Sequence, residues 1–115
     1  LNDASSRFNE GLLVNIVDLG ANVLYLDAAY YVNLYTSSPG SYSFDNATTP
    51  VCTSVDAGNG IGIGTGQVNS ALCTTATLLP SANQNKYVFA DAVYLTPSAH
   101  RQLGDYAYDR LRARW

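Results

Sequence analysis

Residues 45–85 form the least periodic part of this chain, and they constrain its fold more than any other segment. A connection of this length without helical or strand periodicity is uncommon in a compact domain unless it is cross-linked or functional. Both cysteines of the chain, Cys52 and Cys73, lie within it among Thr, Ser, Gly and Asn residues. A disulfide between them would staple the segment, would contribute on the order of 3 kcal/mol in the chain-entropy model, and would imply an oxidising compartment. Two free thiols are the alternative.

The same segment contains five glycines at alternate positions, 58, 60, 62, 64 and 66. They form neither GxGxxG nor GxxxxGK[ST], and no strand leads into them, so a nucleotide site is not predicted. The two cysteines lack the further Cys or His ligands of a zinc pattern. We therefore expect neither a cofactor nor a metal.

The composition is that of one domain with a packed core, because 47% of the 115 residues are apolar and 13% are charged. The net charge is −3, and the basic residues concentrate in the last fifteen positions. That placement suits the C-terminal end of a helix rather than the broad basic face that nucleic acids require. No apolar run approaches the ~18 residues of a membrane span. We therefore expect no nucleic-acid partner and no membrane-spanning segment.

The residues before position 45 show helical and strand-like patterns in turn. Apolar residues recur with helical spacing and predict a helix over residues 3–20, which Gly20 ends. The apolar run that follows, ending on Asp27, predicts a buried strand. Residues 27–40 then predict a second helix, with Asp27 as its N-cap and Pro39 near its end. This order of elements is typical of an α/β protein.

The C-terminal part is again regular. Residues 86–91, KYVFAD, predict a strand, and residues 97–115 predict a helix with Thr96 as its N-cap and proline at its first position. The apolar residues that step by four along one face of this helix, and that we expect to pack on the sheet, are Leu103, Ala107 and Leu111.

Asp91 ends the last predicted strand and begins the loop that enters the last helix. In an open α/β sheet this is the ligand-facing edge. An aspartate in that place commonly orients a histidine base, which activates a hydroxyl nucleophile. An aspartate that only caps its own loop is the alternative interpretation.

The stretch FADAVYLTPSAHRQLGDYA, residues 89–107, resembles the last block of the GDSL, or SGNH, family of serine esterases and lipases. In that family the block contains the Asp and His of a Ser-His-Asp triad. The upstream order of helix, strand ending in Asp and helix, followed by TTPVC at residues 48–52, is similar to that of the secreted and autotransporter-passenger members, which have Thr-x-Pro-Cys at this point. The resemblance implies a three-layer α/β/α sandwich with a parallel sheet. It covers nearly all of residues 1–115.

Two departures from the family pattern stand out. The Gly-Asp-Ser nucleophile block and the Gly-x-Asn-Asp oxyanion block are absent from this sequence. Both belong to the N-terminal half of the family domain, so residues 1–115 look like its C-terminal part. The expected partner is accordingly an N-terminal segment of the same domain, within one chain or separate after cleavage.

Tyr94 is the second departure, because it stands where the family places its catalytic histidine. A tyrosine, with an ordinary pKa near 10, is a poor general base at neutral pH. An engineered inactive form, a natural pseudoenzyme and an altered mechanism all fit this substitution. His100, the only histidine, is an alternative base; packing or capping in the helix is its other interpretation.

The sequence thus predicts a carboxylic-ester hydrolase, secreted or at a bacterial cell surface, in which this chain supplies Asp91 and the loop of the base. Its substrate would be an ester or a lipid. A non-catalytic lipid- or carbohydrate-binding pseudoenzyme is the alternative function. A structural or adhesin fragment is a third interpretation, which only the polar loop favours.

Overall fold

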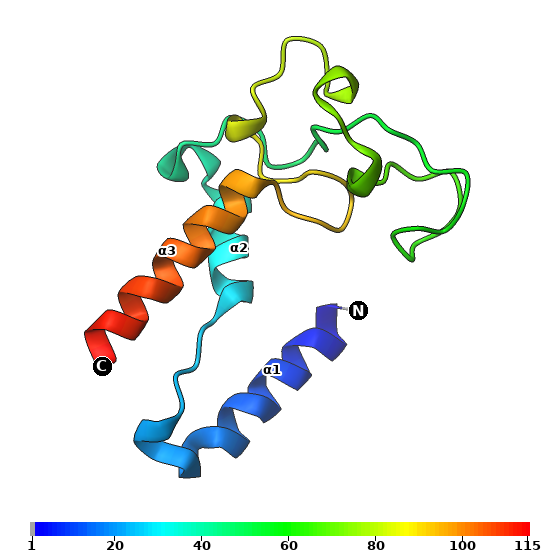
Figure 1. Cartoon of the computed structure of the whole chain (residues 1–115). Coiled ribbons are helices and arrows are strands. Elements are labelled where there is room, and N and C mark those ends of the chain that lie inside the picture. Colours follow the sequence, from blue (N-terminus) through cyan, green and yellow to red (C-terminus); the bar gives the residue numbers. More distant parts are fainter. Residues whose placement is uncertain (1) are drawn as a thin grey trace.

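The computed structural model describes residues 2–115, and its architecture is helical (Figure 1). Three α-helices carry most of the regular structure: α1 (Asn2–Ile16), α2 (Ala28–Ser37) and α3 (Pro97–Arg114). Short 3-10 segments lie in the connections between them, namely η1 (Val17–Asn22), η2 (Pro39–Tyr42), η3 (Ser70–Leu72), η4 (Thr75–Thr77) and η5 (Gln84–Lys86). Residues 2–115 contain isolated β-bridges but no named strand. The predicted α/β/α sandwich with a parallel sheet is therefore wrong.

The first predicted strand fails because it has no partner. Residues 23–27 run as an extended connection between η1 and α2 (Figure 1), and Val23 has an extended backbone. Among the described residues, the backbone hydrogen bonds of this segment are short-range: from Val23 N to Gly20 O, from Ala28 N to Leu26 O and from Tyr31 N to Asp27 O. A strand is defined by its ladder to a neighbour, so this apolar run stays unpaired.

The second predicted strand, residues 86–91, has a partner that cannot continue a ladder. Its residues exchange backbone hydrogen bonds with residues 45–52, including Val88 N to Asn46 O and Cys52 N to Ala90 O. The Asn46 side chain accepts from the N–H groups of the next two threonines and turns the chain. Pro50 then offers no N–H to the pairing. Isolated bridges replace a sheet as a result.

The helices α2 and α3 confirm two predictions, and their caps explain where they begin. Asp27 accepts a hydrogen bond from Tyr30 N at 2.9 Å, and Thr96 accepts one from Ala99 N at 3.2 Å. Such caps satisfy N–H groups that have no partner inside the helix. The first predicted helix is also present, although α1 ends at Ile16 and Gly20 lies within η1 at φ +60°.

The hydrophobic core lies where the end of α2 meets the start of α3 and the loop segments. Tyr35, Phe44, Val88 and Ala99 are its buried members, and Leu103 packs against them. Farther along the helices, Tyr31 stacks on Tyr106 with ring centroids 3.7 Å apart. Apolar and aromatic packing thus joins α2 to α3 and to the loops.

The face of α3 that was predicted to cover a sheet has a different environment. Leu103 reaches the core, whereas Leu111 is 45% exposed. The described residues offer no sheet for this face to cover, so the helix extends beyond the core toward its C-terminus. The prediction that this face of α3 packs on a sheet is therefore wrong.

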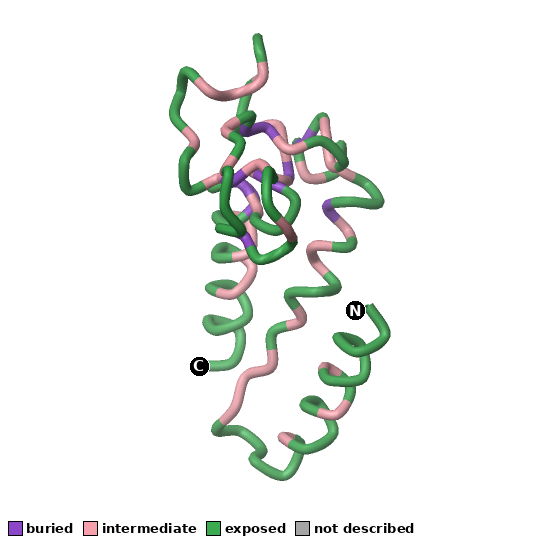
Figure 2. The backbone as a smooth tube through the Cα atoms, turned by 90° about the vertical axis from the view of Figure 1, so that its right-hand side faces the viewer, coloured by how far each residue is buried: buried purple, intermediate pink, exposed green. Residues whose placement is uncertain are grey.

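Residues 2–34 contain no buried residue, as the tube in Figure 2 shows. Large apolar side chains of α1 are open to solvent, among them Phe8 at 70% and Val14 at 69% exposure. The Cα radius of gyration is 16.5 Å, whereas a compact domain of this length has about 13 Å. The core and the loops that hold the candidate site therefore lie entirely in residues 35–115.

Candidate functional site

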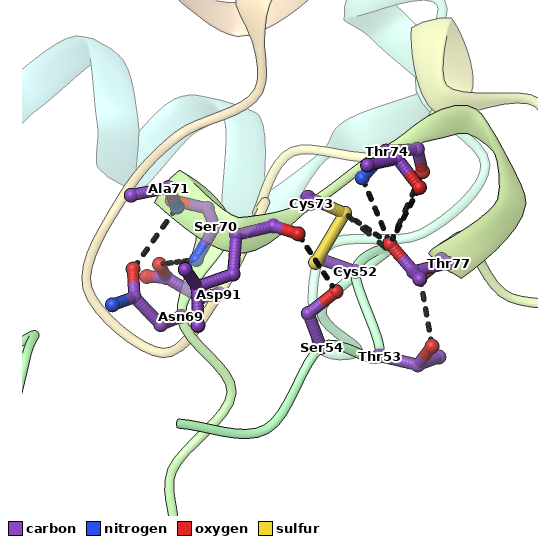
Figure 3. Close-up of a disulfide and its surroundings, with 11 residues drawn as sticks. Cys52, Thr53, Ser54, Asn69, Ser70, Ala71, Cys73, Thr74, Thr77 and Asp91 are labelled. Atoms are coloured by element: carbon purple, nitrogen blue, oxygen red, sulfur yellow. Dashed lines mark hydrogen bonds between the residues drawn. A yellow bond between two sulfur atoms is a disulfide. The ribbon is translucent and has the colours of Figure 1, made fainter. Parts of the chain in front are cut away.

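Asp91 is fully buried and is held by backbone N–H groups from two segments. Its Oδ1 accepts hydrogen bonds from Val93 N and Tyr94 N, both at 2.8 Å. Its Oδ2 accepts from Ser70 N at 2.8 Å, a bond drawn in Figure 3. Ala90 N also donates to Tyr94 O at 2.9 Å and closes the loop. Asp91 therefore caps its own loop and ties that loop to η3.

The hydrogen bonds decide the charge state of Asp91. Burial by itself raises the pKa of this carboxyl, since low polarity disfavours the charged form. Hydrogen bonds from Ser70, Tyr94 and Val93 act in the opposite direction and outweigh burial, so the pKa lies below its ordinary value. Asp91 is thus a buried carboxylate that stays ionised at neutral pH.

The predicted disulfide between Cys52 and Cys73 is confirmed, with the two Cα atoms 5.9 Å apart and a sequence separation of 21 (Figure 3). Each cysteine also belongs to the surroundings of Asp91. Cys52 N donates to Ala90 O at 3.1 Å, and Cys73 N donates to Ser70 O at 3.1 Å. The cross-link consequently joins the segment that contains Ser70 to the segment that pairs with Ala90, the residue before Asp91.

A cavity of about 500 Å³ lies beside this cross-link. The disulfide, Val51 and Ala90 contribute to its wall, together with Leu78 and Leu95. Pro97 and several threonine, serine and glutamine residues complete the lining, and no lining residue is charged or aromatic. Such a mixture of apolar walls and a few neutral polar groups is common in sites for small molecules.

The other predicted site residues are not joined to Asp91 through their side chains. Tyr94 donates its backbone N–H to Asp91, but its side chain is 52% exposed. Within residues 2–115 the Tyr94 hydroxyl makes no hydrogen bond, and neither does the His100 ring. His100 lies exposed in the first turns of α3. The geometry therefore brings together Asp91 and the backbone of Tyr94, and His100 donates no hydrogen bond to Asp91 among the described residues.

Ser70 is the site residue that the sequence reasoning missed. It reaches Asp91 only because the long loop folds back across the disulfide. A weak local signal does exist, since Asn69 caps η3 by accepting from Ala71 N at 3.0 Å. That signal predicts a turn at this point, but it does not indicate which distant carboxylate the turn will meet.

No family model matches this chain, and no curated protein or solved structure is significantly similar to it. The assignment of a function therefore rests on the residues and geometry described above. None of the helices in residues 2–115 has both the length and the apolar character needed to cross a bilayer.

Proposed function

We propose that this chain is part of a carboxylic-ester hydrolase and that Asp91 orients the catalytic base. The observation that carries the proposal is the buried carboxylate of Asp91, which has a lowered pKa and accepts hydrogen bonds from three backbone N–H groups. It lies at the start of the loop that leads into α3. A rigid, ionised aspartate is what a base needs as its orienting partner. The neighbouring uncharged cavity offers space for a neutral ester.

The other two members of the triad are the base and the nucleophilic serine. Tyr94 occupies the base position of the resembled family, and a phenol is a poor base at neutral pH. The nucleophilic serine would come from an N-terminal segment, because no Gly-Asp-Ser block lies in these 115 residues. The complete protein would act outside the cytoplasm, in keeping with the Cys52–Cys73 bridge.

A non-catalytic lipid- or carbohydrate-binding role is the second candidate, and one observation favours it. The three backbone N–H groups that donate to Asp91 lie in loops or turns, as expected of a carboxylate that only caps a loop. In such a pseudoenzyme, Tyr94 has no need to exchange protons with its neighbours.

Replacement of Tyr94 by histidine distinguishes the two roles. In the full-length gene product, Tyr94→His should raise kcat/KM for short nitrophenyl esters by about 10³-fold or more, since a triad member contributes at least this much. The backbone N–H of residue 94 already donates to Asp91, so the introduced imidazole ring should lie close to the carboxylate that would orient it. Initial rates at pH 8 provide the measurement.

Tyr108→His is the matched control, because Tyr108 is similarly exposed at 59% but lies on α3 away from Asp91. It should leave the rate at that of the parent. Background hydrolysis by Tyr94→His, or an upstream gene sequence without a Gly-Asp-Ser block, would count against the hydrolase and in favour of the binding role.

A further inference from the structure

Tyr31 of α2 and Tyr106 of α3 lie face to face. Their ring centroids are 3.7 Å apart and their planes are inclined by 30°, so the two π faces are in van der Waals contact. Both side chains are partly buried, and Tyr31 packs against the hydrophobic core. The pair thus connects two helices that are separated in sequence by the whole of the long loop.

The two hydroxyl groups lie at the same end of this stack. Partial burial raises the pKa of the Tyr31 hydroxyl, and the next largest cause is the negative charge that the neighbouring Tyr106 would carry as a phenolate. Such an electrostatic effect weakens with distance, so it requires the two oxygens to be near each other. The carbons ortho to the hydroxyls, which flank them on each ring, are therefore near each other as well.

Ortho carbons are the positions at which two oxidised tyrosines couple. Loss of one electron and one proton converts each phenol into a phenoxyl radical, whose unpaired electron is shared between the oxygen and the ortho and para carbons. Two radicals combine by forming a carbon–carbon bond between ortho positions, and each of these carbons then gives its hydrogen to its own oxygen, which restores both phenols. The pair loses two electrons and two protons in total. Hydrogen peroxide accepts them through a peroxidase and becomes two molecules of water.

A stacked contact favours this coupling more than an edge-on contact does. The half-filled orbital of a phenoxyl ring is perpendicular to the ring plane, so stacked rings direct their two orbitals toward each other. Two other tyrosine pairs in residues 2–115 meet edge-on, Tyr30 with Tyr31 at 88° and Tyr35 with Tyr42 at 69°. Tyr30 is also 55% exposed, so it offers the oxidant an accessible ring beside Tyr31.

We infer that Tyr31 and Tyr106 are the site of an intramolecular dityrosine cross-link between α2 and α3, formed by hydrogen peroxide and a peroxidase. The side chains that oxidants commonly attack first are absent, because the chain has no methionine and both cysteines are in the disulfide. The disulfide also indicates an oxidising compartment, in which such an oxidant is compatible with the protein. The cross-link is independent of the proposed hydrolase activity.

Treatment of the full chain with hydrogen peroxide and a haem peroxidase tests this inference. The monomer should lose the mass of two hydrogen atoms and gain the blue fluorescence of dityrosine, with a yield that does not depend on protein concentration. After reduction and digestion with trypsin, residues 8–86 should be joined to residues 102–110. A monomer of unchanged mass, under conditions that convert free tyrosine to its dimer in a parallel reaction, would overturn the inference. Cross-links found only between chains would overturn it as well.

Phenylalanine variants identify the two partners, because they keep the stacked ring and remove only the hydroxyl. Tyr31→Phe and Tyr106→Phe should each lower the yield of cross-linked monomer by about tenfold or more. Tyr108→Phe is the matched control, since Tyr108 is 59% exposed on the same helix and in the same tryptic peptide, and no ring in residues 2–115 stacks on it. This control should keep the yield of the parent. A yield that survives in Tyr31→Phe or Tyr106→Phe, or that falls equally in Tyr108→Phe, would assign the link to other tyrosines and refute the site.

Discussion

Asp91→Ala should lower the free energy of unfolding by about 3 kcal/mol or more, because three backbone N–H groups lose their acceptor at once. Ser70, Val93 and Tyr94 donate these bonds, and each unsatisfied donor that stays buried costs about 1–3 kcal/mol. Asp91→Asn should cost less, since its amide keeps one acceptor oxygen in the same shape. Urea unfolding at pH 7 measures both.

The acid dependence of stability should change in the same variants. The pKa of Asp91 is lower in the folded chain than its ordinary value of 3.8. Its contribution is therefore fully present above that value and is lost as pH falls through the lower, folded pKa. Asp91→Asn should flatten this part of the acid transition. Asp56, whose pKa is also lowered, remains in both proteins and accounts for the acid dependence that persists.

Asp109→Ala provides the control, because Asp109 is exposed on α3 and should change stability by less than about 0.5 kcal/mol. A loss in Asp91→Ala no larger than in this control would show that water replaces the carboxylate without cost. The loop would then be as stable without the Asp91 cap as with it.

Removal of the disulfide should have the other large effect. Cys52→Ala with Cys73→Ala should cost about 3 kcal/mol in the chain-entropy model, and should lower Tm by roughly 10 °C or more. The Ser70 amide should also lose its hydrogen-bonded chemical shift, because the cross-link joins the segment that contains Ser70 to the segment that pairs with Ala90. Calorimetry and ¹H–¹⁵N spectra provide the two readouts.

Reductant supplies the control for this experiment. It should destabilise the parent by about as much as the double substitution does, and it should leave the double variant unchanged. Intact mass should increase on reduction by the mass of two hydrogen atoms per chain, because the reductant supplies two electrons and two protons are taken up. A parent that shows no mass difference, or whose Tm is unaffected by reductant, would contradict the structural role of the bridge.

Local signals in the sequence were sufficient for the helices and for the cross-link. Asp27 and Thr96 are caps that act within three residues of themselves, so their helices could be predicted without knowledge of the rest of the chain. The cysteines stood alone as a pair in a polar segment. Each of these inferences depends on neighbours in sequence or on a count of residues.

Strand pairing could not be predicted in this way, because it depends on distant partners. Residues 86–91 have a strand-like pattern, yet their partner contains Asn46 and Pro50, which turn the chain and remove a donor. Residues 23–27 are as apolar as a central strand, but none of the described segments pairs with them. The apolar pattern predicted the extended conformation of residues 23–27, but it contained no information on a pairing partner.

The same limit applies to the site. Asp91 was identified from its position after an apolar run, and its loop-capping bonds to Val93 and Tyr94 are local. Its third bond, to Ser70, spans 21 positions and required the folded loop. The cavity likewise combines residues from several separate stretches of chain, so no single motif could have revealed it.

The arrangement around Asp91 also has a consequence for the order of folding. The bonds from Cys52 to Ala90, from Ser70 to Asp91 and across the disulfide join residues far apart in sequence, so each requires a long loop to close. The helices α2 and α3 need only local contacts and nucleate first on this basis. We therefore expect the pocket and its buried carboxylate to be assembled last. Partly folded chains would then have helical content before they have the cavity.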